Sequence, residues 1–221
     1  MNILALDTSG TSAGIALVRD EVTLGEVFLA LERHHSEILL PAVDQLLRVT
    51  GVRMKDLDLF ACTVGPGSFT GVRIGVSTVK GLALACDRPV AGVSTLEALA
   101  ENAAGSPLPI CPMLDAKRGQ VYRGLYRSDA GGSLLNLVPD GVGAADEILA
   151  GIETDAVFIG NGTRVYRDKI LARRNGKSYF APPHLHRISA AAVGSIARRR
   201  AVAGDVLEAI QLAPVYIRRE L

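Results

Sequence analysis

The sequence predicts an α/β fold built from two similar units, and three observations support this prediction. Apolar runs of strand length alternate with longer segments whose apolar residues recur at helical spacing. The first half of the chain contains a glycine-dense loop, residues 65–75, that leads directly into an apolar helix. The two halves also share a weak repeat, in which an apolar strand ends in aspartate and is followed by a turn and a second strand.

The first half has the pattern of an antiparallel meander followed by alternating helices and strands. We predict strands at 2–8, 14–18, 22–31, 57–64 and 89–93, and helices at 36–49, 70–86 and 94–104. Pro41 should kink the first of these helices or delay its start. Ser94 and Glu97 have the spacing of a capping box at the start of the last one.

The second half has a similar alternation. We predict strands at 110–114, 120–126, 134–138 and 156–160, helices at 145–150 and 189–203, and a loop over 175–186. The repeat relates residues 3–7 to residues 111–115. We therefore expect two mixed β-sheets flanked by helices, in an N-terminal unit of residues 1–106 and a smaller C-terminal unit of residues 107–221.

The composition is typical of a soluble globular protein, with 48% hydrophobic and 21% charged residues. No apolar run reaches the roughly 18 residues of a membrane-spanning helix, and the N-terminus lacks the basic lead of a signal peptide. Cys62, Cys86 and Cys111 lie far apart, without metal-ligand or redox spacing. We expect buried free thiols, a cytoplasmic protein and no membrane partner.

The net charge of +1 hides an asymmetry, because residues 1–110 sum to −4 and residues 111–221 to +5. The densest basic run is Arg198, Arg199 and Arg200. Such a run fits contact with RNA or with an acidic partner. It also fits a solvated helix face, and the sequence leaves both interpretations open.

The glycine-dense loop has two interpretations. A helix that begins directly after such a loop presents free N–H groups to an anion, and glycines also permit a close contact between two backbones. A candidate vestigial phosphate site would combine this loop with the two aspartates that end the repeated strands. Its members would be Asp7, Thr8, Ser9, Gly67, Ser68 and Asp115. The aspartates could approach a hydrated Mg²⁺ or simply stabilise their turns.

Catalytic motifs are poorly supported. His34 and His35 are adjacent, so on a helix they would point about 100° apart and could not share a metal. Ser68 lacks the flanking glycines of a nucleophile elbow. The nearest candidate for an adenine-binding glycine pair is the short run at 160–162. We therefore expect no catalytic residue and no metal site.

Six segments occur in the order found in the TsaB family, also called YeaZ. They are ILALDTS at 3–9, HSEILLP at 35–41, GPGSFTGVRIG at 65–75, VSTLEAL at 93–99, DAKRGQVY at 115–122 and PVYIR at 214–218. The chain therefore resembles this family over essentially its whole length. The resemblance implies the actin-like (ribonuclease H-like) fold of the actin-like ATPase and sugar-kinase superfamily.

The resemblance also implies a role in threonylcarbamoyl transfer to N6 of adenosine, next to the anticodon, in tRNAs that read codons beginning with A. The transfer would be catalysed by the paralogue TsaD, and this chain would be the non-catalytic subunit that binds and activates it. The ATPase TsaE would join them. ATP and threonylcarbamoyl-adenylate would be used by the complex, with none bound by this chain alone, and tRNA would be reached indirectly. Self-association as a homodimer is implied as well. The alternative is a free-standing actin-like ATPase or phosphotransferase.

The partner surface is predicted from small residues on one helix face. Gly71 and Gly75 are four apart, which would let another helix approach closely. We expect the helices at 36–49 and 70–86 to form the subunit interface, the alternative being that both belong to the chain's own core. The contact residues would be Ile38, Leu39, Val43, Leu46, Gly71, Val72, Gly75, Thr78 and Val79.

Overall fold

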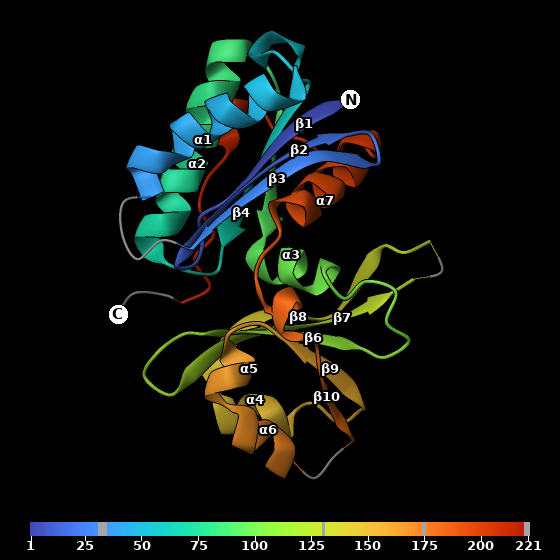
Figure 1. The fold of residues 1–221 in the computed structure, drawn as a ribbon. Helices are drawn as coiled ribbons and strands as arrows, with labels where there is room; N and C mark the ends of the chain where they lie inside the picture. The colour runs from blue at the N-terminus through green and yellow to red at the C-terminus, as the bar shows by residue number, and fades with distance from the viewer. Residues whose placement is uncertain (31–34, 130, 174–175, 219–221) are drawn as a thin grey trace. The chain divides into compact units, whose positions relative to one another are not determined.

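The computed structural model describes residues 1–30, 35–129, 131–173 and 176–218, and it forms two compact units (Figure 1). Unit 1 comprises Met1–Ala98 and Ser189–Val215, and unit 2 comprises Leu99–Ile188 and Tyr216–Leu221. Each unit is built around one five-stranded mixed sheet.

The sheet of unit 1 has the strand order β3-β2-β1-β4-β5. Its strands are β1 (Asn2–Asp7), β2 (Ser12–Arg19), β3 (Val22–Ala30), β4 (Leu59–Gly65) and β5 (Val90–Ser94). The first three pair antiparallel, as the predicted meander requires, and β1, β4 and β5 pair in parallel.

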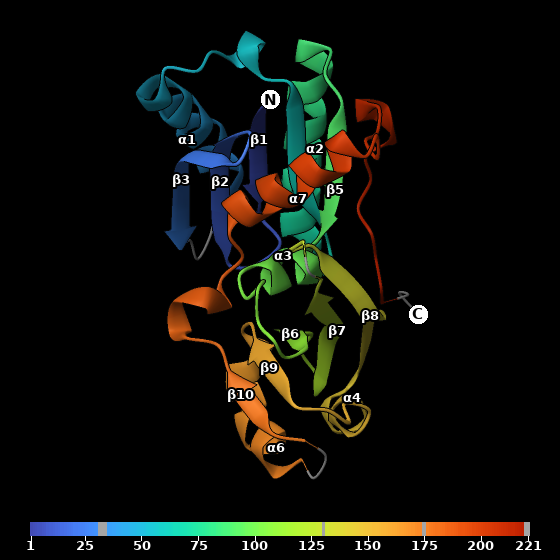
Figure 2. The same cartoon turned by 90° about the vertical axis from the view of Figure 1, so that its right-hand side faces the viewer.

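Helices cover both faces of this sheet (Figures 1 and 2). One face, which includes Leu4 and Leu6, packs in a common core with α1 (His35–Thr50) and α2 (Phe69–Cys86). α1 runs through Pro41 without ending. The other face receives α7 (Ala190–Val202), whose Gly194 lies against Val18 and Ala5. The N-terminus of α7 is capped by Ser189 and by Glu26 of β3, whose carboxylate accepts hydrogen bonds from Ser189 Oγ and Ala191 N.

Shorter elements complete unit 1. They are η1 (Met54–Asp56), η3 (Ala209–Gln211) and the helix α3 (Thr95–Glu101), which follows β5 and crosses the boundary between the units in sequence. Ser94 Oγ accepts hydrogen bonds from Leu96 N and Glu97 N, so Ser94 caps α3 as predicted.

Unit 2 repeats the same topology, with the strand order β10-β9-β6-β7-β8. Its strands are β6 (Ile110–Asp115), β7 (Gln120–Ser128), β8 (Leu134–Ala144), β9 (Ala156–Ile159) and β10 (Ser178–Phe180). β6, β7 and β8 pair antiparallel and β6, β9 and β10 in parallel, so each strand has a counterpart in unit 1. The predicted internal repeat is therefore confirmed.

Four short helical segments belong to unit 2. They are α4 (Ala145–Ala150), α5 (Gly162–Val165), α6 (Arg167–Ala172) and η2 (Pro183–His186). Leu149 of α4 and Ile170 of α6 share a core with Cys111, Met113 and Phe158 of the sheet.

Three predictions need correction. The boundary after residue 106 is wrong, because α7 and the segment to Val215 return to unit 1, where the small residues of α7 fit closely on β1 and β2. The segment 175–186 is not only loop: it contains β10, which pairs with β9, and η2. β8 continues to Ala144, beyond the predicted end, because it stays paired with β7. The predicted end of the third strand, residue 31, lies outside the described residues.

Gly194→Val should lower the free energy of unfolding by about 2 kcal/mol, because the added side chain would overlap Val18 where α7 packs on the sheet. Gly81→Ala is the matched control in α2, where an added Cβ meets nothing within 4 Å. It should raise stability by about 0.5–1 kcal/mol, since alanine favours the helix. Urea unfolding measures the stability of both variants. An unchanged free energy of unfolding in Gly194→Val would contradict the packing of α7 on the sheet.

His186 should make the stability of unit 2 depend on pH. Burial lowers the pKa of His186, a hydrogen bond with the Ala181 backbone opposes this shift, and the charges of Arg164 and Arg167 reinforce it. Its Nδ1 accepts a hydrogen bond from Gly160 N at 2.9 Å, which requires an unprotonated Nδ1. As the pH falls below the usual histidine pKa of about 6.5, the unfolded chain takes up the proton first, so stability declines. Urea unfolding between neutral and mildly acidic pH should show a shallower decline for His186→Asn than for the wild type.

Candidate functional site

The turn that follows β1 is held by hydrogen bonds to one carboxylate oxygen of Asp7. Asp7 Oδ1 accepts hydrogen bonds from Ser9 N at 3.1 Å, Ser9 Oγ at 2.6 Å and Thr63 Oγ1 of β4 at 2.6 Å. Asp7, Thr8 and Ser9 are all buried. A carboxylate that accepts several hydrogen bonds in a buried turn stabilises that turn.

The glycine loop packs directly on this turn. Ser68 N donates to Ser9 O at 2.7 Å, and Thr8 Oγ1 donates to Gly71 O at 2.7 Å. A Cβ added at Gly67 would overlap Ser9 O, and one added at Gly71 would overlap Thr8 O. Of the two interpretations of the loop, the structure therefore shows the close backbone contact.

The N-terminus of α2 is capped by a residue of the chain itself. Ser68 Oγ accepts a hydrogen bond from Gly71 N at 3.2 Å, and so caps the helix. The predicted phosphate-site residues Asp7, Thr8, Ser9, Gly67 and Ser68 do come together, and they contact one another within the chain. As structural elements they hold β1, β4 and α2 in place.

Asp115, the sixth predicted member, belongs to unit 2. Its carboxylate forms an ion pair with Lys117 Nζ at 2.7 Å and accepts a hydrogen bond from Lys117 N. Although burial opposes the shift, these contacts with Lys117 hold the pKa of Asp115 below its usual value. Lys117 and Arg118, together with Gly119, have positive φ, which makes this a tight hairpin turn.

The glycines at 160 and 162 also face the chain itself. A Cβ at either position would meet the carbonyl of Met113 on β6. These glycines let the β9–α5 loop cross β6 closely, and that requirement accounts for both of them without a nucleotide.

The predicted interface residues lie mostly on the inner faces of their helices. Those buried within unit 1 are Leu39, Val43, Leu46, Gly71, Val72, Gly75 and Val79. Only Ile38 and Thr78 are partly exposed. A Cβ at Gly75 would meet Thr8 Oγ1, so the small-residue face of α2 receives the chain's own turn. Because both faces of α2 carry apolar residues, the sequence pattern did not indicate which face is buried within unit 1.

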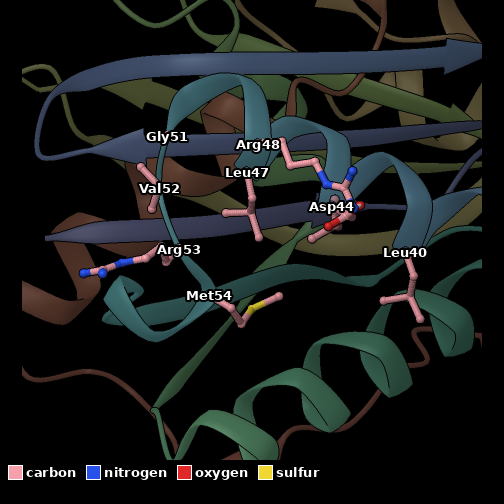
Figure 3. Close-up of a pocket in the computed structure, with 9 residues that line it drawn as sticks. Leu40, Asp44, Leu47, Arg48, Gly51, Val52, Arg53 and Met54 are labelled. Carbon is pink, nitrogen blue, oxygen red and sulfur yellow. Dashed lines mark ion pairs between the residues drawn. The ribbon is translucent and has the colours of Figure 1, made fainter.

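The outer faces of α1 and α2 present different residues. The exposed side chains there include Leu40, Asp44 and Arg48 on α1 and Phe69, Arg73 and Leu84 on α2. A hollow of about 400 Å³ lies beside α1, lined by Leu40, Leu47, Val52 and Met54, with the Asp44–Arg48 ion pair (2.9 Å) among its lining residues (Figure 3). Arg73 stacks on the ring of Phe69, with 3.7 Å from its guanidinium carbon to the ring centroid.

The basic run on α7 is engaged within unit 1. Arg198 pairs with Glu21 at 2.9 Å, and Arg199 donates to Ser195 Oγ. Arg200 pairs with Glu97 at 2.6 Å and donates to the Gly92 carbonyl. These contacts hold α7 against the β2–β3 turn and β5, so the run is not an open basic patch.

The three cysteines differ in burial. Burial raises the pKa of the Cys111 thiol to about 12 and that of Cys62 above its usual range. Cys86 is partly exposed, contrary to the prediction of a buried thiol. Among the described residues, no three histidine, cysteine or acidic side chains gather as a metal site. By length and composition α2 could span a membrane, a test that core helices of soluble proteins also pass, and it packs against β4.

Gly71→Ala should lower the free energy of unfolding by about 3 kcal/mol, because its methyl group would overlap the Thr8 carbonyl oxygen and the backbone would have to move. Ser68→Ala removes only the cap and should cost about 1 kcal/mol. Chemical unfolding measures the loss of stability in each variant. Equal losses would contradict the close contact between Gly71 and Thr8.

Comparison with known proteins agrees with this fold. A family model described as TsaD: tRNA N6-adenosine threonylcarbamoyltransferase matches residues 26–204. The tRNA threonylcarbamoyladenosine biosynthesis protein TsaB of Bacillus subtilis is 42% identical over 173 residues, covering 77% of this chain and 75% of the relative. Its namesake in Escherichia coli is 38% identical over 134 residues, covering 60% of this chain and 58% of the relative.

Solved structures give the same result. YeaZ from Pseudomonas aeruginosa superposes with a TM-score of 0.86 at 30% identity, covering 97% of this chain and 99% of that one. The (R)-2-hydroxyglutaryl-CoA dehydratase component A of Acidaminococcus fermentans, at 10% identity and a TM-score of 0.55 over 91% of this chain and 99% of that one, shares only the fold. The chain therefore belongs to the protein family that the TsaD model describes, and within it to the TsaB (YeaZ) branch.

Proposed function

We propose that this chain takes part in the biosynthesis of threonylcarbamoyladenosine in tRNA as a non-catalytic subunit that binds and activates TsaD. TsaD would transfer the threonylcarbamoyl group to N6 of the adenosine next to the anticodon, in tRNAs that read codons beginning with A. ATP and threonylcarbamoyl-adenylate would be consumed by the complex, with TsaE as a further member. The family membership and the names of the relatives support this assignment.

The proposed non-catalytic role is supported by the burial of the turn after β1. Asp7 is fully buried, and its neighbours Ser9 and Thr63 donate to it. The space beside the loop glycines, where a nucleotide could have approached, is occupied by Ser9 and Thr8. A group that must meet a substrate needs access to it, and these groups face one another.

The partner would dock on the outer faces of α1 and α2. This surface combines exposed apolar side chains, Leu40 and Phe69, with the hollow beside α1 and with charges at its edge. Apolar anchors that fit a pocket inside a polar rim are typical of protein–protein interfaces. A second copy of the chain could use the same surface, so a homodimer would compete with the heterodimer.

The alternative function, a free-standing ATPase or phosphotransferase, has less support. It needs an open phosphate site and an adenine platform, whereas the candidate loops of unit 1 and unit 2 pack on the chain itself. No observation on the described residues favours it over the subunit role.

A reconstituted tRNA-modification assay tests the proposal. TsaD, TsaE, ATP and threonylcarbamoyl-adenylate are combined with tRNA, with and without this chain. We expect modified tRNA only when the chain is present, and no ATP turnover by the chain alone. Unchanged product without the chain would overturn the proposed role, and ATP turnover by the purified chain would favour the alternative.

Leu40→Asp should weaken binding to TsaD by about tenfold or more, because it places a charge at the centre of the proposed apolar contact. Leu40 is 51% exposed, so folding should be unaffected. Val202→Asp is the matched control, since Val202 is 73% exposed on α7. Isothermal titration calorimetry measures both affinities, with unfolding midpoints as the check on folding. Equal affinities for the two variants would remove this face of α1 from the interface.

A further inference from the structure

The excess of positive charge in the second half of the chain has an exposed location in unit 2. Residues 161–187 contain seven lysines and arginines and a single carboxylate, Asp168. This segment forms α5, α6, β10 and η2 (Figures 1 and 2). A partner can contact only those cations that are not already engaged within unit 2.

Two of them have structural roles. Arg173 donates hydrogen bonds to Ser178 Oγ and to three backbone carbonyls, those of Ile152, Thr154 and Lys177. Lys169 pairs with Asp146 at 2.6 Å. Neither side chain is available without breaking contacts that hold unit 2 together.

Arg164 and Arg167 differ from these. Both are exposed, and neither forms an ion pair with a residue in the part of the chain that the structure describes. The guanidinium carbon of Arg167 lies 4.1 Å from the centroid of the Phe180 ring, a cation–π contact that places the charge over the ring. Both arginines lower the pKa of His186 in η2, so the charge of each reaches that histidine. We call Arg164, Arg167 and the Phe180 ring the arginine patch.

We propose that the arginine patch binds RNA directly, with Arg164 contacting a phosphate and Arg167 stacking beneath a base. Arginine is suited to bidentate contact with phosphate. The exposed guanidinium of Arg167 also offers a planar group beside an aromatic ring, and RNA-binding proteins stack unpaired bases on such planes. An acidic peptide would use the charge but has no use for the plane, so the geometry favours RNA.

This contact goes beyond the proposed function, in which tRNA is reached through the partner. It also replaces the predicted basic site at Arg198–Arg200, whose side chains are engaged within unit 1. The test uses the full chain alone, so it does not depend on TsaD binding or on tRNA modification.

Fluorescence anisotropy with a labelled stem-loop RNA, titrated at several salt concentrations, measures the contact. The double variant Arg164→Ala/Arg167→Ala should weaken binding about tenfold at low salt, and the slope of log affinity against log salt should fall by about 1, since only Arg164 contacts a phosphate. The charge-matched control, Arg198→Ala/Arg199→Ala, should leave both quantities near the wild-type values. Arg164→Ala alone, an exposed change with no effect expected on folding, should reproduce part of the loss.

Two further measurements test the stacking contact and the kind of ligand. Arg167→Lys keeps the charge and loses the plane, so it should weaken binding to an unpaired loop more than binding to a plain RNA duplex. A polyglutamate competitor distinguishes RNA from an acidic protein. The proposal fails if the wild type does not bind the RNA, if the two double variants lose equal affinity, or if polyglutamate competes as well as RNA at equal charge.

Discussion

The close approach of the glycine loop to the turn after β1 is the constraint on which unit 1 depends. Three glycines, at 67, 71 and 75, face Thr8 and Ser9, and a Cβ on any of them would overlap an atom of that turn. Hydrogen bonds from Ser68 N and Thr8 Oγ1 close the contact. Because the turn also carries Asp7, which bonds Thr63 of β4, one small cluster fixes the positions of β1, β4 and α2 together. The glycines in this cluster act by being small, which permits the close packing that is typical of a protein core.

The same cluster explains why the two faces of α2 have different roles. α2 uses its glycine face on its own chain, and its outer face is left with Phe69, Arg73 and Leu84. A substitution such as Gly75→Leu would therefore change folding before it could report on pairing. Changes on the outer faces of α1 and α2 act on exposed side chains, so they separate pairing from stability. This separation follows from the packing and holds for any partner that uses those faces.

Much of this fold could be predicted from the sequence. Long periodic segments such as α2 and the aspartate-ended strands β1 and β6 carry strong local patterns, and the repeat predicted the shared topology of the two sheets. The missed elements have other causes. β10 has three residues and depends on pairing with β9 and on Arg173, a contact that no local pattern encodes. The return of α7 to unit 1 depends on its fit to Val18 and Ala5, residues about 180 positions away. Which face of an all-round apolar helix is buried is likewise decided by tertiary contacts, so the predicted interface residues fell on the inner face.

The two units have the same strand order but use the turn after their first strand differently. In unit 1 the Asp7 turn is buried under the glycine loop. In unit 2 the equivalent Asp115 is held by Lys117, in a turn where two non-glycine residues adopt positive φ. Such backbone conformations cost about 1–2 kcal/mol per residue, so the turn is maintained by the Asp115–Lys117 contacts around it. The repeat therefore conserves the framework of an α/β unit, while the residues at equivalent turns have diverged into a packed core contact in one unit and an exposed, positively charged turn in the other.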